Sequence, residues 1–153
     1  MRTLEKIAFL SGIALLLAAP VRAWAQGPRW RGPQGWGPGG AYGRLYDPAK
    51  VEKLSGQVLE VRKVMPMRGM SSGVELVVKT PPETIAVHLG PAWFVENQEP
   101  RIAKGDTVEV EGSRVAVAGK PVVLAASVRK GDDLLQLRDA AGVPAWAGWR
   151  RGR

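Results

Sequence analysis

Three of the four methionines in this 153-residue chain lie within six positions, in the segment VMPMRGM. They are Met65, Met67 and Met70, and the fourth is the initiator Met1. Thioethers are soft ligands that suit Cu(I) and Ag(I), and a histidine imidazole binds the same ions. The only histidine is His88, so the candidate metal ligands are these three methionines and His88. The alternative is that the methionines fill an irregular corner of the core, as flexible Met side chains commonly do.

His88 belongs to the segment ETIAVHL, in which Ile85, Val87 and Leu89 alternate with other residues. If those three line the interior of a sheet, His88 points outward near the end of its strand. Trp93 follows five residues later, where its ring could cap a bound soft cation. The sequence therefore leaves a metal site and a simple packing role both open for this region.

The residues needed for catalysis are scarce in this chain. It has no cysteine and one histidine, and most carboxylates alternate along expected strands. No nucleophile elbow, phosphate loop, dinucleotide fingerprint or cluster of metal ligands accompanies the histidine. We therefore predict a protein that is not an enzyme, with no catalytic residues and no cofactor apart from the Cu(I) or Ag(I) alternative.

Aromatic rings and arginines form a second group of candidate binding residues. Such side chains anchor many protein interfaces, because they supply large contact area and bidentate hydrogen bonds. The candidates lie in PAWFVENQ and in the tail WAGWRRGR, and they are Trp93, Phe94, Trp146, Trp149, Arg150 and Arg151. For the two tail tryptophans the alternative is that they fold back over an edge strand.

The first 25 residues have the three parts of a secretory signal peptide. Arg2 and Lys6 precede an apolar run of thirteen residues, 7–19, which is followed by Ala23-Trp24-Ala25. The run is shorter than the roughly 20 residues that a membrane span requires. We therefore predict cleavage after Ala25, a periplasmic or secreted location, and no membrane span in the mature chain.

The formal net charge of +8 is concentrated at the two ends of the chain. Residues 46–137 carry twelve basic and twelve acidic side chains. A domain that binds nucleic acid usually has a basic face, because neutralised phosphates supply much of the affinity. Nucleic acid is therefore not favoured as a partner, and we expect a protein partner in the cell envelope. The sequence leaves the oligomeric state open.

Composition divides the chain into four parts: a signal peptide (1–25), a Gly/Pro/Trp-rich linker (26–45), a domain (46–137) and a Trp/Arg-rich tail (138–153). The linker lacks apolar periodicity, so we expect an unpacked arm. Within the domain, alternation predicts strands at 54–64, 73–79, 83–89, 106–114 and 121–128, a short helix within 91–98, and a last strand or turn at 134–137.

Five strands with a helical insertion between the third and fourth follow the order of an OB-fold, a small Greek-key barrel. About 90 residues are enough to close one such barrel with a modest core. We therefore predict an all-β, five-stranded OB-fold-like barrel with flexible Trp/Arg/Gly-rich ends.

The stretch from Tyr46 to Trp149 resembles a group of small exported bacterial proteins that carry an OB-fold behind a signal peptide. The segments that carry the resemblance are YDPAKVEKLSGQV, GMSSGVEL, VHLGPAWFVENQ and LRDAAGVPAWAGWRR. Members are often labelled DNA-binding proteins, because OB-folds commonly bind single strands. The resemblance implies the fold, and it implies DNA binding only by analogy of fold.

Met, His and Trp on a small barrel are also similar to the periplasmic copper and silver chaperones of the Cus efflux system. That resemblance implies ligand roles for His88, Met65 and Met67, with Trp93 capping the ion. The order differs, because the Met-x-Met pair precedes the histidine here and follows the tryptophan in that family. A shared site would therefore be convergent.

Together these features predict an exported, non-catalytic OB-fold binding module of the periplasm or cell envelope. Two alternatives stay open. One is a Cu(I)/Ag(I) carrier that uses the Met cluster and His88, and the other is a protein that binds single-stranded nucleic acid.

Overall fold

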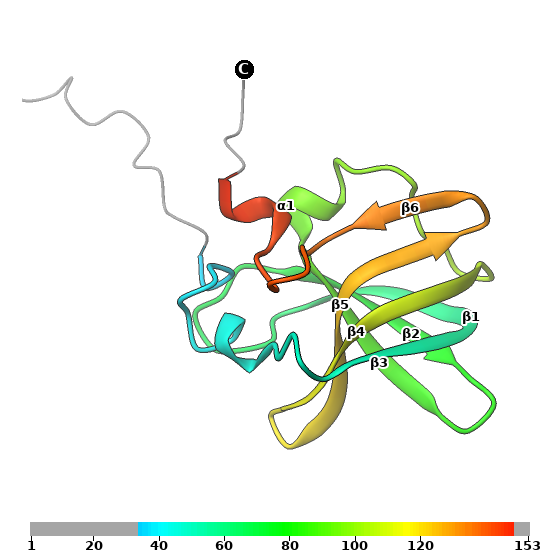
Figure 1. The fold of residues 1–153 in the computed structure, drawn as a ribbon, viewed down its shortest axis with the longest axis horizontal. Coiled ribbons are helices and arrows are strands. Elements are labelled where there is room, and N and C mark those ends of the chain that lie inside the picture. Colours follow the sequence, from blue (N-terminus) through cyan, green and yellow to red (C-terminus); the bar gives the residue numbers. More distant parts are fainter. Residues whose placement is uncertain (1–33, 149–153) are drawn as a thin grey trace, which may run out of the picture. The chain divides into compact units, whose positions relative to one another are not determined.

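The computed structural model describes residues 34–148, which form an all-β domain with short helical turns beside the sheet (Figure 1). Its strands are β1 (Val51–Val64), β2 (Gly73–Lys79), β3 (Thr84–Pro91), β4 (Thr107–Val117), β5 (Lys120–Lys130) and β6 (Asp133–Gln136). The helical turns are η1 (Gly43–Leu45), α1 (Ala92–Val95) and η2 (Ala145–Gly148). The expected helix between the third and fourth strands is confirmed, and the expected last element is a sixth strand.

The strands make one sheet that closes on itself through hydrogen bonds. Their order is β3-β2-β1-β4-β5-β6, and β3 also pairs with β5. That pairing is parallel and joins 86–88 to 122–124, whereas the pairs between sequence neighbours and the β1–β4 pair are antiparallel. A ring of strands β1, β2, β3, β5 and β4 results, and β6 extends it beyond β5.

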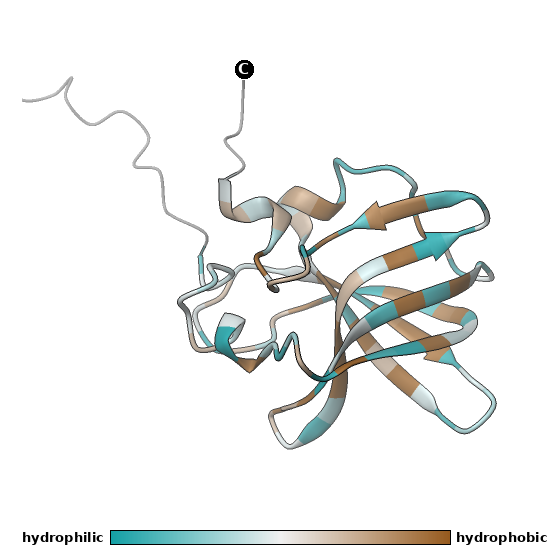
Figure 2. Cartoon of the chain, viewed as in Figure 1, coloured by the Kyte–Doolittle hydropathy of each residue, from teal (hydrophilic) through white to brown (hydrophobic). Residues whose placement is uncertain are grey.

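Hydrophobic and hydrophilic residues alternate along the strands (Figure 2), and buried apolar side chains form the core of the domain. On β3, Ile85, Val87 and Leu89 are at most 3% exposed, and on β4 Val108 and Val110 are at most 1% exposed. Successive side chains of a strand point to opposite faces, which is why this spacing predicted the strands correctly. Burial of each such side chain contributes roughly 1.5–3 kcal/mol to folding.

β1 is the longest strand and changes its neighbour midway. Its residues 51–57 pair with β4, and its residues 57–64 pair with β2. A register shift between Val58 and Glu60 lies in the second half. The bulge explains why the apolar residues of this segment keep no single alternation in the sequence.

The segments before β1 and after β6 pack into the core. Trp36, Tyr42 and Trp146 are at most 2% exposed, and the indole N–H of Trp146 donates a 2.8 Å hydrogen bond to the Trp36 carbonyl. Residues 34–45 were expected to form an unpacked arm, and the structure instead places their rings in the domain. The part of the tail up to residue 148 also packs against the domain. This agrees with the alternative in which Trp146 folds back over the sheet.

Two strand glycines make this packing possible. A Cβ atom on Gly90 of β3 would lie 2.6 Å from the ring of Trp146, and one on Gly73 of β2 would collide with the ring of Trp36. Since these positions have no side chain, the large rings approach the strand backbone closely. The Trp36 indole N–H also donates a 3.0 Å hydrogen bond to the Ser71 carbonyl.

Arg138 is the most deeply buried cation of the described chain, with 3% of its surface exposed. Its guanidinium lies 4.8 Å from the centre of the Tyr46 ring and 5.2 Å from that of Trp146, and it donates a hydrogen bond to the Gly142 carbonyl. Burial lowers the pKa of this group from its usual value. The two rings hold the cation by cation–π contact and join both ends of the domain.

Candidate functional site

A hollow of about 470 Å³ lies over the outward faces of β2 and β3, and we call it the His88 groove. The loop after β1 borders it on one side, and the turn between β4 and β5 borders it on the other. Its lining residues are Arg62, Val64, Met65, Pro66, Glu75, Ala86, His88, Val117, Ala118, Lys120, Pro121 and Val122. Both polar and apolar groups are therefore available to a ligand.

A chain of hydrogen bonds forms the floor of the groove and joins Arg62, Glu75, His88 and Tyr42. The Arg62 guanidinium donates to Oε1 of Glu75 at 2.5 and 2.6 Å. Oε2 of Glu75 lies 3.0 Å from Nε2 of His88, and Nδ1 of His88 lies 3.0 Å from the Tyr42 hydroxyl. Glu75, His88 and Tyr42 are at most 5% exposed, so solvent has little access to the bonds among these three, whereas the Arg62 side chain is 50% exposed.

The partners of His88 determine its tautomer. A carboxylate only accepts hydrogen bonds, so Nε2 carries the proton and donates to Glu75. Nδ1 then accepts from the Tyr42 hydroxyl. Burial lowers the pKa of His88, while the hydrogen bond and charge of Glu75 act in the opposite direction. Burial is the larger of these effects, so the net shift of the pKa is downward and fits a neutral imidazole at neutral pH.

Sheet register and the N-terminal segment bring these residues together. Glu75 of β2 and His88 of β3 are direct cross-strand partners, next to a register shift between Val74 and Glu75. Tyr42 comes from the segment before β1, and its ring stacks on the imidazole with 6.0 Å between centres. The burial of Tyr42 raises its own pKa.

His88 differs from the sequence expectation in one respect. It was expected to point outward as an available ligand, and it does lie on the face opposite Ile85, Val87 and Leu89. However, its side chain is only 2% exposed and both ring nitrogens have partners. Tyr42 covers the imidazole ring, and this residue belongs to the segment that we predicted to be a linker.

The three candidate methionines lie in different environments. Met65 is 63% exposed and borders the His88 groove, Met67 is half-buried, and Met70 is 7% exposed in the core. Only Met65 therefore shares the groove with His88. Across residues 34–148, no group of three or more His, Asp or Glu side chains is placed to bind a metal ion.

The expected ligand-binding rings lie largely in the interior. Phe94 is 4% exposed and packs against Trp146, with 5.6 Å between ring centres. Trp93 is half-buried and meets Phe94 edge to face. In Figure 1, η2 accordingly lies beside α1. Trp149, Arg150 and Arg151 lie outside the described residues.

Three residues of the floor escaped sequence reasoning, namely Arg62, Glu75 and Tyr42. One signal was available for Glu75, because it lies between the apolar Val74 and Leu76 in a strand with few polar residues. A buried carboxylate in such a strand requires a partner, and the only histidine of the chain is in the next strand. The role of Tyr42 depends on a contact between residues far apart in sequence.

Within the described part of the chain, none of the helices has the length and apolar character to cross a membrane. A comparison with curated proteins returned no match. A family model described as the MamS/MamX magnetosome protein family matches residues 50–135. This span runs from the start of β1 to β6 and contains the Arg62, Glu75 and His88 positions, while Tyr42 precedes it. Since the match covers more than half of the sequence, the chain belongs to the MamS/MamX magnetosome protein family.

Proposed function

We propose that this chain is an exported, non-catalytic OB-fold module that binds a protein partner in the His88 groove, in the cell envelope or at the magnetosome. The observation that carries the proposal is the position of the groove, over β2 and β3 and between the loop after β1 and the β4–β5 turn. OB-folds bind their ligands on the corresponding strands and loops.

The strand order supports the OB-fold part of the proposal. The ring runs β1-β2-β3-β5-β4, with a parallel β3–β5 pair and a short helix between β3 and β4. This is the connectivity expected for a Greek-key barrel of that type. β6 and the two terminal segments are additions to the basic five strands.

A binding role fits the groove better than catalysis. Three of its four ionisable lining groups, Arg62, Glu75 and His88, are held in mutual hydrogen bonds, and the fourth is Lys120. A general base needs a free nitrogen or oxygen that reaches the substrate, and both His88 nitrogens are engaged. The lining residues include no serine, threonine or cysteine to act as a nucleophile.

The chemistry of the lining fits a protein segment. Val64, Met65, Pro66 and Val117 supply apolar contact, and Lys120 supplies a cation at the rim. An exposed Met side chain adapts to varied partners. Single-stranded nucleic acid is less well matched, because the lining residues include no Trp, Tyr or Phe ring and the His88 side chain is only 2% exposed.

Export and family membership together support the location. Residues 1–25 have the pattern of a signal peptide, which would carry the domain across a membrane. The family name refers to the magnetosome. We therefore propose that the exported domain works at the cell envelope or in association with that organelle. Deletion of residues 1–25 is expected to leave the protein in the cytosolic fraction, and unchanged fractionation would contradict export.

The binding proposal can be tested by site-specific crosslinking in cells that express the full chain. A photo-crosslinking phenylalanine analogue replaces Met65 in the groove, or Val143, which is 45% exposed and outside the groove lining, as the matched control. We expect a discrete crosslinked envelope or magnetosome protein from position 65 and not from position 143. Identical crosslinks from both positions would overturn the groove as the binding site.

The presence of Met65 and His88 on one groove supports Cu(I) or Ag(I) binding as a second candidate function. A metal ion would have to displace the Tyr42 or Glu75 hydrogen bond from the imidazole. Anaerobic competition of the purified chain with a chromogenic Cu(I) chelator tests this function. The Met65→Leu and His88→Ala variants should each lose binding, while Met70→Leu should retain it. No competition by the parent chain would eliminate the candidate.

A further inference from the structure

One edge of β1 has no neighbouring strand along half of its length. The β4 side of β1 is occupied up to Val58, whose N–H donates to the Asp106 carbonyl at 2.8 Å and whose carbonyl accepts from Gly105 at 2.7 Å. Beyond that point, residues 60–64 pair with β2 on their other side only, and Leu59 lies at the register shift. Within the described chain, one row of their backbone N–H and carbonyl groups therefore faces no strand.

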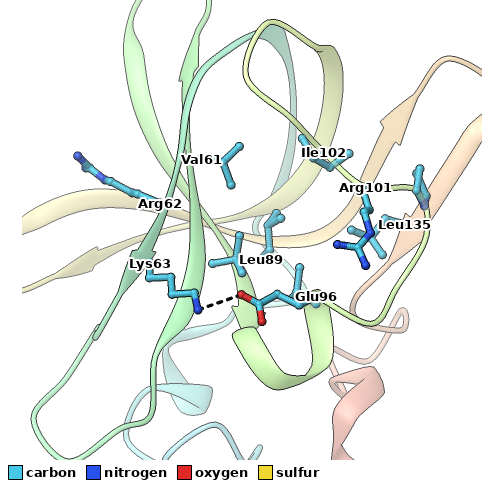
Figure 3. A pocket seen from close by; sticks show the side chains of 11 residues that line it. Val61, Arg62, Lys63, Leu89, Glu96, Arg101, Ile102 and Leu135 are labelled. Atoms are coloured by element: carbon cyan, nitrogen blue, oxygen red, sulfur yellow. Dashed lines mark ion pairs between the residues drawn. The ribbon is translucent and has the colours of Figure 1, made fainter.

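A groove of about 290 Å³ runs beside this edge, and we call it the edge groove (Figure 3). β1 forms one wall through Val61 and Lys63, and the segment after α1 forms the other through Arg101 and Ile102. Leu89 lies at its floor, where it is 2% exposed. The groove thus offers an apolar base below an unpaired strand edge.

The edge groove and the His88 groove lie on different faces of β1 and share Arg62 at their border. Val61 and Lys63 line the edge groove, and Figure 3 shows the Arg62 side chain extending away from it. Arg62 instead reaches Glu75 below the His88 groove. Successive strand residues point to opposite faces, so a ligand in one groove need not occupy the other.

Charges at the rim of the edge groove are exposed and only loosely paired. Lys63 and Glu96 form an ion pair of 3.2 Å across its lower end (Figure 3). Arg101 lies 3.5 Å from Glu99, and both side chains are more than 70% exposed. Exposed pairs of this kind contribute little to stability and exchange readily. Arg101 is therefore available to a carboxylate from outside the chain.

We propose that the edge groove binds an extended segment of a partner protein, which pairs with residues 59–64 as an added strand. Its apolar side chains would lie on the base near Val61 and Leu89, and an acidic side chain would meet Arg101. Strand addition of this kind takes its affinity from backbone hydrogen bonds and its selectivity from alternate side chains.

The two walls of the edge groove favour one extended chain over a second folded copy. The second wall, with Arg101 and Ile102, stands opposite the β1 edge (Figure 3), so a partner must enter between the walls to reach the backbone of β1. The edge also carries exposed apolar side chains between its charged ones. Leu59 and Val61 are 38% and 39% exposed on it, next to Glu60, Arg62 and Lys63, so a partner segment can gain apolar contact as well as backbone hydrogen bonds.

The test uses the full chain purified from expressing cells and a fluorescein-labelled peptide of ten residues that alternates valine with aspartate. Fluorescence anisotropy should report saturable binding that weakens about tenfold in the Arg101→Glu variant, because one charge-assisted contact is lost. The control Arg129→Glu makes the same charge change at an exposed position of β5 outside the groove, and it should bind like the parent.

A second peptide, with lysine in place of aspartate, completes the design. It should bind weakly to the parent and better to Arg101→Glu. In amide NMR spectra, the shifts caused by the aspartate peptide should map to residues 59–64. Equal affinity of both peptides for both proteins, or shifts confined to other strands, would overturn the proposal. Concentration-dependent dimerisation that the peptide fails to reverse would assign the edge to a second copy instead. None of these readouts depends on the crosslink from position 65.

Discussion

Two arginine-centred clusters on this domain use the same chemistry in different surroundings. In the first, Arg62 bonds to Glu75, whose side chain is 6% exposed and also holds His88. In the second, Arg114 bonds to Glu52 and Glu83, whose side chains are 39% and 38% exposed. Both arginines form ion pairs with two carboxylates, because Arg62 also lies 3.8 Å from Glu60. The comparison therefore keeps the number of arginine–carboxylate pairs equal and varies the burial of the carboxylates.

Exposure to solvent accounts for the expected difference between the two clusters in their contribution to stability. The hydrogen bonds to Glu83 and Glu52 raise the pKa of Arg114, and the Arg114 hydrogen bond lowers the pKa of Glu83. Water competes for each of these exposed groups, so such contacts stabilise the fold only slightly. Glu75 and His88 lack that competition, and a partner left alone in the interior would remain unsatisfied.

The largest expected effect follows from removal of Glu75. Glu75→Ala leaves the buried His88 without its acceptor and removes the hydrogen bonds of Arg62, so we expect the free energy of unfolding to fall by about 3 kcal/mol. Glu75→Gln keeps the shape and one acceptor, and it should cause a smaller loss. Urea denaturation measures both values. A loss for Glu75→Ala as small as that of an exposed carboxylate would contradict the importance of burial.

The second expected effect is a dependence of stability on pH in the range where histidine titrates. Burial holds the pKa of His88 below its usual value, so the unfolded chain takes up a proton at a higher pH than the folded chain. Stability should therefore fall as the pH drops through about 6.5, by at most about 1.4 kcal/mol per pH unit, until the folded pKa is passed.

Denaturation curves at pH 7.5 and pH 5.5 measure this loss, with His88→Gln as the control. His88 is the only histidine of the chain, so the variant should be nearly flat in this interval. Glu83 and Asp106 have lowered pKa values, and their contributions fade only in the more acidic range below the usual carboxyl values. An equal pH dependence in parent and variant would contradict the linkage to His88.

Much of the strand pattern could be predicted from the sequence, because local alternation encodes it. The segments around Val78, Val87 and Val110 each alternate with a period of two, and each is a strand. The packed ends were not predictable in this way. Trp36 and Trp146 lie in Gly/Pro-rich or short segments without periodicity, and their burial depends on glycines far away in sequence.

The candidate site was predictable only in part for a related reason. His88 drew attention because it is unique, and Met65 because it belongs to a cluster. Glu75 becomes the partner of His88 only through the register of β2 against β3, next to a shift that alternation cannot reveal. Tyr42 reaches the same histidine across 46 positions of sequence. Register and long-range contacts are set by packing of the whole domain.

A smaller loss of stability is expected from a change at Tyr42, the last residue in the series of hydrogen bonds that runs through Glu75 and His88. Tyr42→Phe removes the hydroxyl that donates to Nδ1 of His88, so the free energy of unfolding should fall by about 1 kcal/mol. The lost bond favoured the neutral imidazole, so the pKa of His88 should rise toward its usual value. NMR titration of the ring proton measures this rise. The control is Tyr46→Phe, which changes a half-buried tyrosine that does not take part in these hydrogen bonds. This variant should leave the pKa of His88 unchanged.

The smallest effect is expected for the exposed Arg114 cluster, although Arg114 contacts as many carboxylates as Arg62 does. Arg114→Gln removes contacts to both Glu52 and Glu83, which join β1 and the start of β3 to β4. Because these groups face solvent, the loss of stability should be well below that of Glu75→Ala, and added salt should reduce it further. Urea denaturation at low and high ionic strength measures both. A loss of stability for Arg114→Gln as large as that for Glu75→Ala, with no influence of salt, would contradict this expectation. The exposed cluster would then stabilise the contact between the strands as strongly as the buried one, and burial would not explain which charges stabilise this domain.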